Sequence, residues 1–174
     1  FKLGAEWAEF FAQNHFLVGV SLDGVIHTHD AYRLDAGGKG SFAEIMKTLE
    51  LFDEKRVEYN ILTVVNRRTA DRISKIYAFY AKHNWKYLQF IACLDPLGEK
   101  PGMREYSLTP EVYGDFLVKL FDLWYLDWQK GTQPSIRFFE NYIGILMGYM
   151  PEACDQRGMC SLQTVVEADG SVYP

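Results

Sequence analysis

The sequence contains few cysteines, no excess of positive charge and no long apolar run. Its three cysteines among 174 residues are an odd number and a poor basis for the disulfide framework of a secreted protein. The net charge of −5 argues against a nucleic acid or an anionic membrane as a partner. No apolar stretch approaches the roughly 20 residues that span a bilayer, and no basic segment with an apolar stretch behind it opens the chain. We therefore expect a cytoplasmic protein without a nucleic-acid or membrane partner.

Two common catalytic motifs are also missing. The glycine-rich stretch 37–40 lacks the spacing of a phosphate-binding loop, and the chain has no Gly-x-Ser-x-Gly nucleophile motif. The composition, with 48% hydrophobic and 16% aromatic residues, can bury a core and excludes disordered and low-complexity classes. The chain begins with Phe1 rather than Met and ends at Pro174, directly after a predicted hairpin. We therefore expect both ends to be cut from a longer protein.

Helical and strand patterns alternate along the chain, which predicts an α/β fold. Apolar, β-branched runs at 17–22, 57–65 and 87–93 predict buried parallel strands. Helical spacing of apolar residues predicts crossover helices between them. Further strands at 164–166 and 171–173 flank an Ala-Asp-Gly turn and predict a hairpin. The three parallel strands are too few for a closed barrel, so the pattern predicts a partial (β/α) barrel that ends in a β-hairpin.

Three polar residues are expected to start helices. Ser41 and Glu44 fit a capping box, and Thr69 is expected to cap the helix that follows the second strand. Thr109, with a proline behind it, predicts the start of a long helix whose aromatic stripe packs in the core.

The expected strand ends carry residues, most of them polar, that could form a functional site. The carboxyl ends of parallel strands meet at one edge of the sheet, where α/β proteins place their functional groups. The residues at these ends are Ser21, Asp23, Asn66, Arg67, Cys93, Leu94 and Asp95. We expect them to line one cleft, with a turn or a helix cap as the competing role of each.

Two pairs of residues could bind a metal. His27 and His29 have the spacing of a metal-binding pair, but the further ligands of a hydrolase are missing, so a hydrogen bond of His29 within its loop is favoured. Cys154 and Cys160 form half of a zinc or iron–sulfur site. Spacing alone leaves metal binding by these cysteines and two ordinary thiols equally open.

Several of these segments together resemble a known family. Residues 18–24, followed by His29, Asp30 and Arg33, resemble the central signature of radical S-adenosylmethionine enzymes with a SPASM extension. The strands at 57–65 and 88–96 resemble the next two strands of these enzymes, and 167–174 resembles the hairpin that opens the SPASM segment. Among these enzymes the sequence is most similar to the anaerobic sulfatase-maturating enzymes.

The resemblance implies an activity, its cofactors and its partners. Such an enzyme oxidises a cysteine or serine of a sulfatase polypeptide to formylglycine. It uses a 5′-deoxyadenosyl radical made from S-adenosylmethionine at a 4Fe-4S cluster, auxiliary 4Fe-4S clusters accept an electron, and an electron donor protein is implied as a partner. Carried over to this chain, Ser21, Leu94 and Asn60 approach the S-adenosylmethionine or the substrate peptide, whereas Cys154 and Cys160 ligate an auxiliary cluster. No catalytic residue is implied within this chain, because the expected base lies beyond its end.

The chain also departs from the family pattern. The three-cysteine motif of the radical cluster and the Gly-Gly-Glu stretch that holds the cofactor are absent, and Val25 replaces the usual proline. We therefore expect a fragment that is inactive alone, with residues 1–148 from the barrel and 149–174 from the start of the SPASM segment. The alternatives are a non-catalytic binding or regulatory module for sulfatase peptides, another SPASM peptide maturase and, last, a metal hydrolase that uses His27 and His29.

Overall fold

The computed structural model describes residues 3–159 and 164–173. The chain divides into two compact units, Phe1–Ile136 and Arg137–Pro174. The first unit contains the parallel sheet and the expected strand ends. None of the helices in the described residues is long and apolar enough to cross a membrane.

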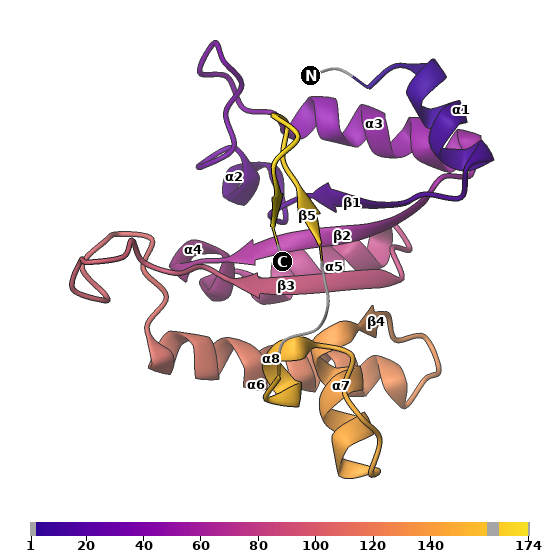
Figure 1. Cartoon of the computed structure of the whole chain (residues 1–174). Helices are drawn as coiled ribbons and strands as arrows, with labels where there is room; N and C mark the ends of the chain where they lie inside the picture. The colour runs from indigo at the N-terminus through magenta and orange to yellow at the C-terminus, as the bar shows by residue number, and fades with distance from the viewer. Residues whose placement is uncertain (1–2, 160–163, 174) are drawn as a thin grey trace. The chain divides into compact units, whose positions relative to one another are not determined.

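The first unit is built on a four-stranded parallel sheet (Figure 1). Its strands are β1 (Leu17–Ser21), β2 (Glu58–Val65), β3 (Tyr87–Ala92) and β4 (Ser135–Ile136). They lie side by side in chain order, β1-β2-β3-β4, and each pair is parallel. The predicted α/β fold and its three parallel strands are confirmed. The sequence pattern missed β4, because two residues are too few to show a period.

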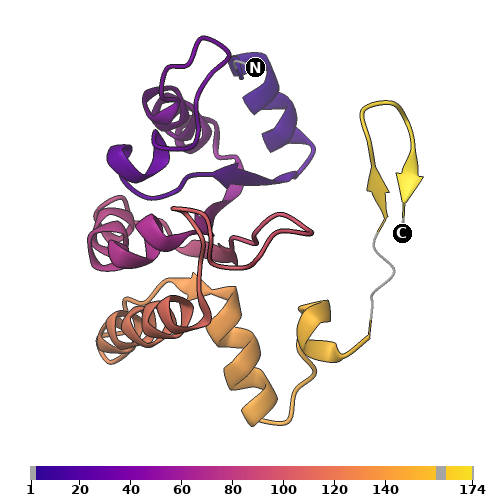
Figure 2. The ribbon, with the colours of Figure 1, turned by 90° about the vertical axis from the view of Figure 1, so that its left-hand side faces the viewer.

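Helices connect these strands. They are α1 (Ala5–Gln13), α2 (Ile26–His29), α3 (Phe42–Lys55), α4 (Arg67–Asp71), α5 (Ile73–Lys82) and α6 (Pro110–Trp128). Helices α3, α5 and α6 lie on one side of the sheet (Figure 2). Consecutive right-handed crossovers between neighbouring strands place successive helices on the same side.

The two faces of the sheet therefore differ in burial. Alternate residues of the strands point to opposite faces. On the helix-covered face the side chains are buried and form the core, as the following residues show: Val20, Ile61, Val65, Leu88 and Ile136. On the other face Ser21, Asn60, Leu62 and Gln89 are only half-buried. This second face presents polar groups that the helices do not cover.

Two of the three predicted helix caps are wrong. Ser41 precedes α3 but its side chain makes no cap hydrogen bond; instead Asp30 Oδ1 accepts from the Phe42 amide at 2.9 Å. Asn66, not Thr69, caps α4, since Asn66 Oδ1 accepts from the Thr69 amide at 3.0 Å. In both places two cap-forming residue types stand close together, and tertiary contacts select between them. Thr109 caps α6 as predicted.

The aromatic stripe of α6 is only partly core. Phe116, Leu120 and Trp124 are buried, whereas Trp128 is half-exposed at the end of the helix. The helix ends there, ahead of Gly131, which adopts a positive φ of 71°.

The second unit contains α7 (Arg137–Leu146), α8 (Cys154–Arg157) and the antiparallel pair β5 (Val165–Val166) and β6 (Val172–Tyr173). Asn141 on α7 is buried, and its Oδ1 accepts from the amide of Glu152 at 2.6 Å. This contact fixes the segment ahead of α8 against α7. In the hairpin turn, Asp169 Oδ1 accepts from the Ser171 amide at 2.8 Å.

Candidate functional site

The segments that follow β1, β2 and β3 meet at the carboxyl edge of the sheet. Tyr32 follows β1 and Tyr106 follows β3, and their rings pack edge to face with centroids 6.2 Å apart. The guanidinium of Arg68, which follows β2, lies 5.8 Å from the centre of the Tyr32 ring. The loops that follow the three strands therefore contact one another at this edge, and a single cleft lined by the predicted strand-end residues stays a prediction.

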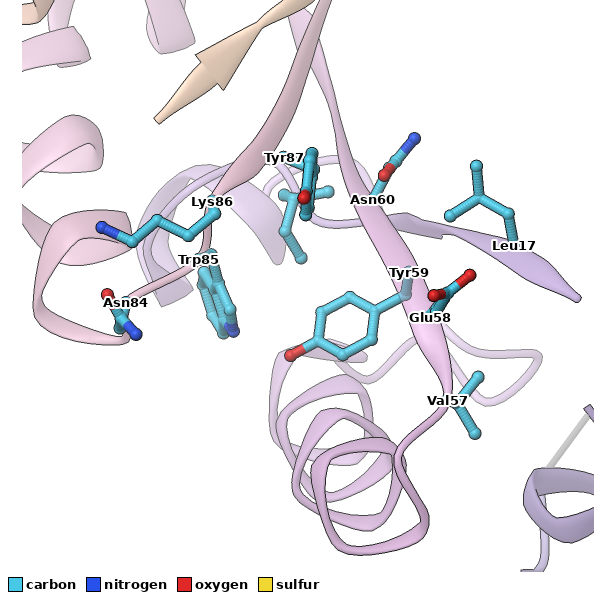
Figure 3. Close-up of a pocket in the computed structure, with 10 residues that line it drawn as sticks. Leu17, Val57, Glu58, Tyr59, Asn60, Asn84, Trp85, Lys86 and Tyr87 are labelled. Atoms are coloured by element: carbon cyan, nitrogen blue, oxygen red, sulfur yellow. The ribbon is translucent and has the colours of Figure 1, made fainter. Parts of the chain in front are cut away.

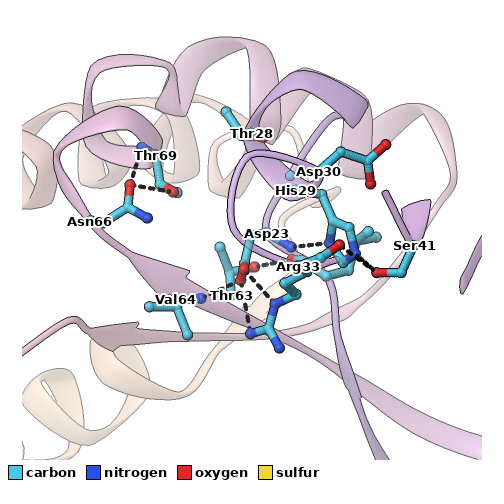
Figure 4. Close-up of polar contacts among 12 residues, drawn as sticks. Asp23, Thr28, His29, Asp30, Arg33, Ser41, Thr63, Val64, Asn66 and Thr69 are labelled. Atoms are coloured by element: carbon cyan, nitrogen blue, oxygen red, sulfur yellow. Dashed lines mark hydrogen bonds and ion pairs between the residues drawn. The ribbon is translucent and has the colours of Figure 1, made fainter. Parts of the chain in front are cut away.

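Asp23 is the central charged group at this edge (Figure 4). Its side chain is almost fully buried, and a buried carboxylate needs hydrogen-bond donors. Oδ2 accepts from Nε of Arg33 at 2.5 Å, and Oδ1 accepts from the amide of Val64 at 2.8 Å. Asp23 thus joins the end of β1 to β2 and holds the Arg33 guanidinium, which is about one-third exposed, at 31%.

His29 lies fully buried beside Asp23. Its Nδ1 accepts from the Asp23 amide at 3.1 Å, and its Nε2 lies 3.0 Å from Oγ of Ser41. The Ser41 hydroxyl donates to the Arg33 carbonyl, so it accepts from Nε2–H, and the imidazole is the neutral Nε2–H tautomer. Burial lowers the pKa of His29, and Arg33 adds to this effect.

These contacts decide the role of the His27 and His29 pair. Both ring nitrogens of His29 are engaged in hydrogen bonds, so neither can bind a metal without losing the bond to the Asp23 amide or the bond to Ser41. His27 is exposed on the same short helix. The favoured prediction, a hydrogen bond of His29 within its loop, is confirmed. Across residues 3–159 and 164–173 no group of three or more acidic, histidine or cysteine side chains could hold a metal ion.

Two buried hydroxyls hold the backbone where β1 ends. The Tyr80 hydroxyl donates to the Leu22 carbonyl at 2.7 Å and accepts from the Gly24 amide at 2.9 Å. Thr63 Oγ1 lies 2.7 Å from the Tyr80 hydroxyl oxygen and 3.0 Å from the Leu22 carbonyl, so its single proton points between these two acceptors. Burial raises the pKa of Tyr80 well above its ordinary value, so this phenol stays neutral and keeps its proton for the hydrogen bond.

Gly24 makes the sharp bend after β1 possible. Its φ is +84°, a conformation that glycine adopts without strain. A Cβ placed on this residue would lie 2.5 Å from Cγ1 of Ile76 on α5. The bend and the close approach of α5 therefore both require glycine here.

The loop between β3 and α6 has its own internal support. Asp95 accepts from the Ser107 hydroxyl at 2.6 Å and from the Gly102 amide at 2.7 Å. The Ser107 hydrogen bond is the main reason that the pKa of Asp95 lies below its ordinary value. The amide of Arg67 donates to the Tyr106 carbonyl at 3.1 Å, which ties this loop to the end of β2.

The cofactor residues expected from the resemblance lie in different places. Ser21 and Asn60 share the uncovered face of the sheet, since Asn60 is in register with Gly19 and Ser21 follows two residues later. Leu94 lies beyond the end of β3 with its side chain 84% exposed. The closeness of Ser21 and Leu94 stays a prediction. Cys93, next to Leu94, has a raised pKa because of burial and the nearby carboxylates of Asp95 and Asp23.

The expected cluster ligands lie in the second unit. Cys154 begins α8 with an exposed thiol. Cys160 lies outside the described residues. The pairing of these two cysteines at a cluster stays a prediction.

A cavity that the sequence did not predict lies at the opposite, amino ends of the strands (Figure 3). It has a volume of about 480 Å³ and lies where β2 and β3 have not yet begun to pair, since their register starts at Ile61 and Leu88. Tyr59, Asn60 and Trp85 are among its lining residues. Its residues are scattered over three segments, so no local motif marks it.

The chain is similar to a set of curated proteins. It is 50% identical over 99% of its length to a cysteine-type anaerobic sulfatase-maturating enzyme of Clostridium novyi, and 45% identical over 97% to that of Clostridium perfringens strain 13. It is 31% identical over 97% to a serine-type enzyme of Bacteroides thetaiotaomicron. The chain covers 46%, 45% and 44% of these proteins, so it spans less than half the length of the curated relatives it matches. No protein-family model matches it.

Solved structures show the same similarity. A structure of native anSMEcpe with bound AdoMet and Kp18Cys peptide superposes with a TM-score of 0.93 at 44% identity, over 99% of this chain and 48% of that chain. A structure of native anSMEcpe with bound AdoMet alone gives the same score and identity, over 47% of that chain.

Proposed function

We propose that this chain, a homologue of the anaerobic sulfatase-maturating enzymes, forms part of a radical S-adenosylmethionine oxidoreductase that converts a residue of a sulfatase polypeptide to formylglycine. The observation that carries the proposal is the match along 99% of the chain, at 50% identity to a curated enzyme and at a TM-score of 0.93 to a structure with AdoMet and a peptide.

Cysteine is the favoured substrate residue. The cysteine-type relatives are 44–50% identical to the chain, whereas the serine-type relatives are 25–31% identical. Residues that distinguish a thiol from a hydroxyl must differ between the two types, and this chain is nearer the first.

In this proposal the sheet is an arc of a (β/α) barrel. The chain order of the strands and the position of α3, α5 and α6 on one side of the sheet support it, because a barrel repeats this arrangement around its axis. The uncovered face then faces the barrel interior. Residues 1–148 supply the arc, and residues 149–174 begin the SPASM segment with the β5–β6 hairpin.

The chain offers suitable groups for S-adenosylmethionine. Ser21 and Asn60 present half-buried polar side chains on the uncovered face, and Leu94 presents an exposed side chain and its backbone at the end of β3. The cofactor, together with a reduced 4Fe-4S cluster, supplies the abstraction of a hydrogen atom from the substrate residue. The role of these three residues is to bind and orient the cofactor and the peptide.

The fit to an auxiliary cluster is partial. The exposed thiol of Cys154 is of the right type, and Cys160 completes a pair in the sequence. A 4Fe-4S cluster takes about four thiolates, so the remaining ligands must come from outside this chain. Such a cluster would accept the electron that the oxidation releases, and an electron donor protein would supply the electron needed to cleave S-adenosylmethionine. We place the reaction in the cytoplasm.

The test uses the complete protein, reconstituted without oxygen with iron and sulfide. We expect bound iron, cleavage of S-adenosylmethionine to 5′-deoxyadenosine and oxidation of a cysteine-containing sulfatase peptide, followed by mass spectrometry. An iron-free protein that binds the peptide without oxidising it would instead be a non-catalytic binding module. Oxidation of the serine peptide in preference to the cysteine peptide would contradict the substrate assignment.

A further inference from the structure

Four residues at the end of β1 form a closed ring of hydrogen bonds (Figure 4). The Asp23 amide donates to Nδ1 of His29, and Nε2 of His29 donates to the Ser41 hydroxyl. The Ser41 hydroxyl donates to the Arg33 carbonyl, and the Arg33 guanidinium donates to the Asp23 carboxylate, which closes the ring. The ring joins four segments: the end of β1, which carries Asp23; α2, which carries His29; the loop after α2, which carries Arg33; and the residue before α3, Ser41.

We propose that the neutral imidazole of His29 is a positioning residue, which holds the Asp23 backbone to the start of α3 and thereby fixes the direction of the Arg33 guanidinium at the strand-end site. His29 is fully buried and touches no solvent, so it acts through Asp23 and Ser41. Of the experiments below, only the measurement of cofactor binding rests on the proposed function; the exchange measurements do not.

The ring requires an uncharged imidazole. A protonated imidazole carries hydrogen on both nitrogens, so its Nδ1–H would face the Asp23 N–H and the link would break. Two carboxylates near the ring, Asp23 and Asp30, favour protonation, while Arg33 opposes it and burial opposes it more strongly.

The helices packed around the imidazole add no further charge to it. From α3, Ser41 bonds to the imidazole and the Phe42 ring lies 6.0 Å from it. From α5, the neutral Tyr80 hydroxyl contacts the Gly24 amide rather than the imidazole. The balance among burial, two carboxylates and one guanidinium therefore sets the pH at which the ring opens.

Two substitutions separate the links of His29. In His29→Asn the amide oxygen can replace Nδ1 as acceptor of the Asp23 amide, whereas in His29→Gln the longer side chain can replace only the contact with Ser41. His27→Asn, on the exposed position of the same helix, is the matched control. In the complete protein, NMR measures hydrogen exchange of the Asp23 amide and the Arg33 Nε–H, without added cofactor.

We expect His29→Gln to accelerate both exchange rates by about tenfold or more, the effect of losing one buried hydrogen bond. His29→Asn and His27→Asn should leave the Asp23 amide protected. In the wild type the Arg33 Nε–H should exchange faster as the pH falls and the imidazole becomes protonated. This trend is opposite to the ordinary slowing of exchange in acid. His29→Asn should abolish the acceleration. The wild-type pH series needs no variant, so it decides the question even where a variant fails to fold.

Unchanged exchange in His29→Gln, or a pH response that persists in His29→Asn, would overturn the proposal. S-adenosylmethionine binding by calorimetry forms a separate arm. His29→Gln and His29→Asn, each of which breaks one link of the ring, should weaken binding, and the control His27→Asn should not. A wild type that binds no S-adenosylmethionine contradicts the proposed function and leaves the exchange result standing.

Discussion

The hydroxyl oxygens of Thr63 and Tyr80 lie 2.7 Å apart beneath the end of β1. Thr63 comes from β2 and Tyr80 from α5. The Tyr80 hydroxyl donates to the carbonyl of Leu22, and the Thr63 proton points between that carbonyl and the Tyr80 oxygen. The turn that carries Asp23 is therefore fixed from below by two elements that are distant in the chain.

Replacing Tyr80 by phenylalanine should destabilise the protein by about 1–3 kcal/mol, because it leaves the buried Gly24 amide without its acceptor. Urea unfolding of the variant measures this loss. Tyr59→Phe is the control, since the Tyr59 hydroxyl bonds to Asp53 at an exposed position and its removal should cost about 1 kcal/mol or less. Equal losses in the two variants would contradict the importance of the buried contact.

Glycine to alanine at two positions should have opposite effects. In Gly40→Ala the new Cβ would overlap the Asp30 carboxylate. Asp30 would move and lose its hydrogen bond to the Phe42 amide at the start of α3. The loss of this helix cap should lower the free energy of unfolding by about 0.5–2 kcal/mol. In Gly114→Ala, within α6, the new Cβ meets nothing within 4 Å, so helix propensity should add about 0.5–1 kcal/mol. Thermal unfolding compares the two, and a stabilised Gly40→Ala would show that Asp30 does not cap α3.

The free energy of unfolding should fall as the pH drops below about 6.5, the ordinary pKa of histidine. In the folded state the pKa of His29 is lowered, so the unfolded chain takes up a proton first and gains stability relative to the fold. The loss continues down to the lowered pKa of the folded state and then levels off. Subtracting the same curve for His29→Asn isolates this contribution, and superimposable curves would show that His29 does not cause it.

Cys154→Ala should abolish peptide oxidation by the reconstituted complete protein while S-adenosylmethionine cleavage continues. The reason is that the proposed auxiliary cluster, and not the radical cluster, loses a thiolate. Iron content should fall in this variant and stay unchanged in Cys93→Ala, whose thiol lies in the other unit of the chain. Normal peptide oxidation by Cys154→Ala would show that Cys154 is not a ligand of the proposed cluster.

Local patterns were sufficient to predict the main elements of the fold. The run 57–65 predicted β2. Helical spacing of apolar residues predicted crossover helices, and in one of them, α5, the buried residues are Ile73, Ile76, Tyr77 and Tyr80. Such patterns work because burial on one face imposes a period on the sequence.

The contacts that define the site could not be predicted in the same way. Asp23 bonds to an amide 41 positions away, and Tyr80 to a carbonyl 58 positions away. A single sequence does not show which distant donors and acceptors the fold will bring together. The sequence favoured a hydrogen bond of His29 within its loop, but the ring that joins it to Asp23 and Arg33 through Ser41 becomes visible only in the structure.

The bend at Gly24 limits how this region can vary among homologous proteins. Its positive φ disfavours any side chain, and Ile76 fills the space that a side chain would need. A shorter side chain at position 76 would relieve the overlap but not the backbone strain. No single compensating change would therefore allow another residue at position 24. We therefore expect evolution to keep glycine here even where the neighbouring loop changes in length and composition.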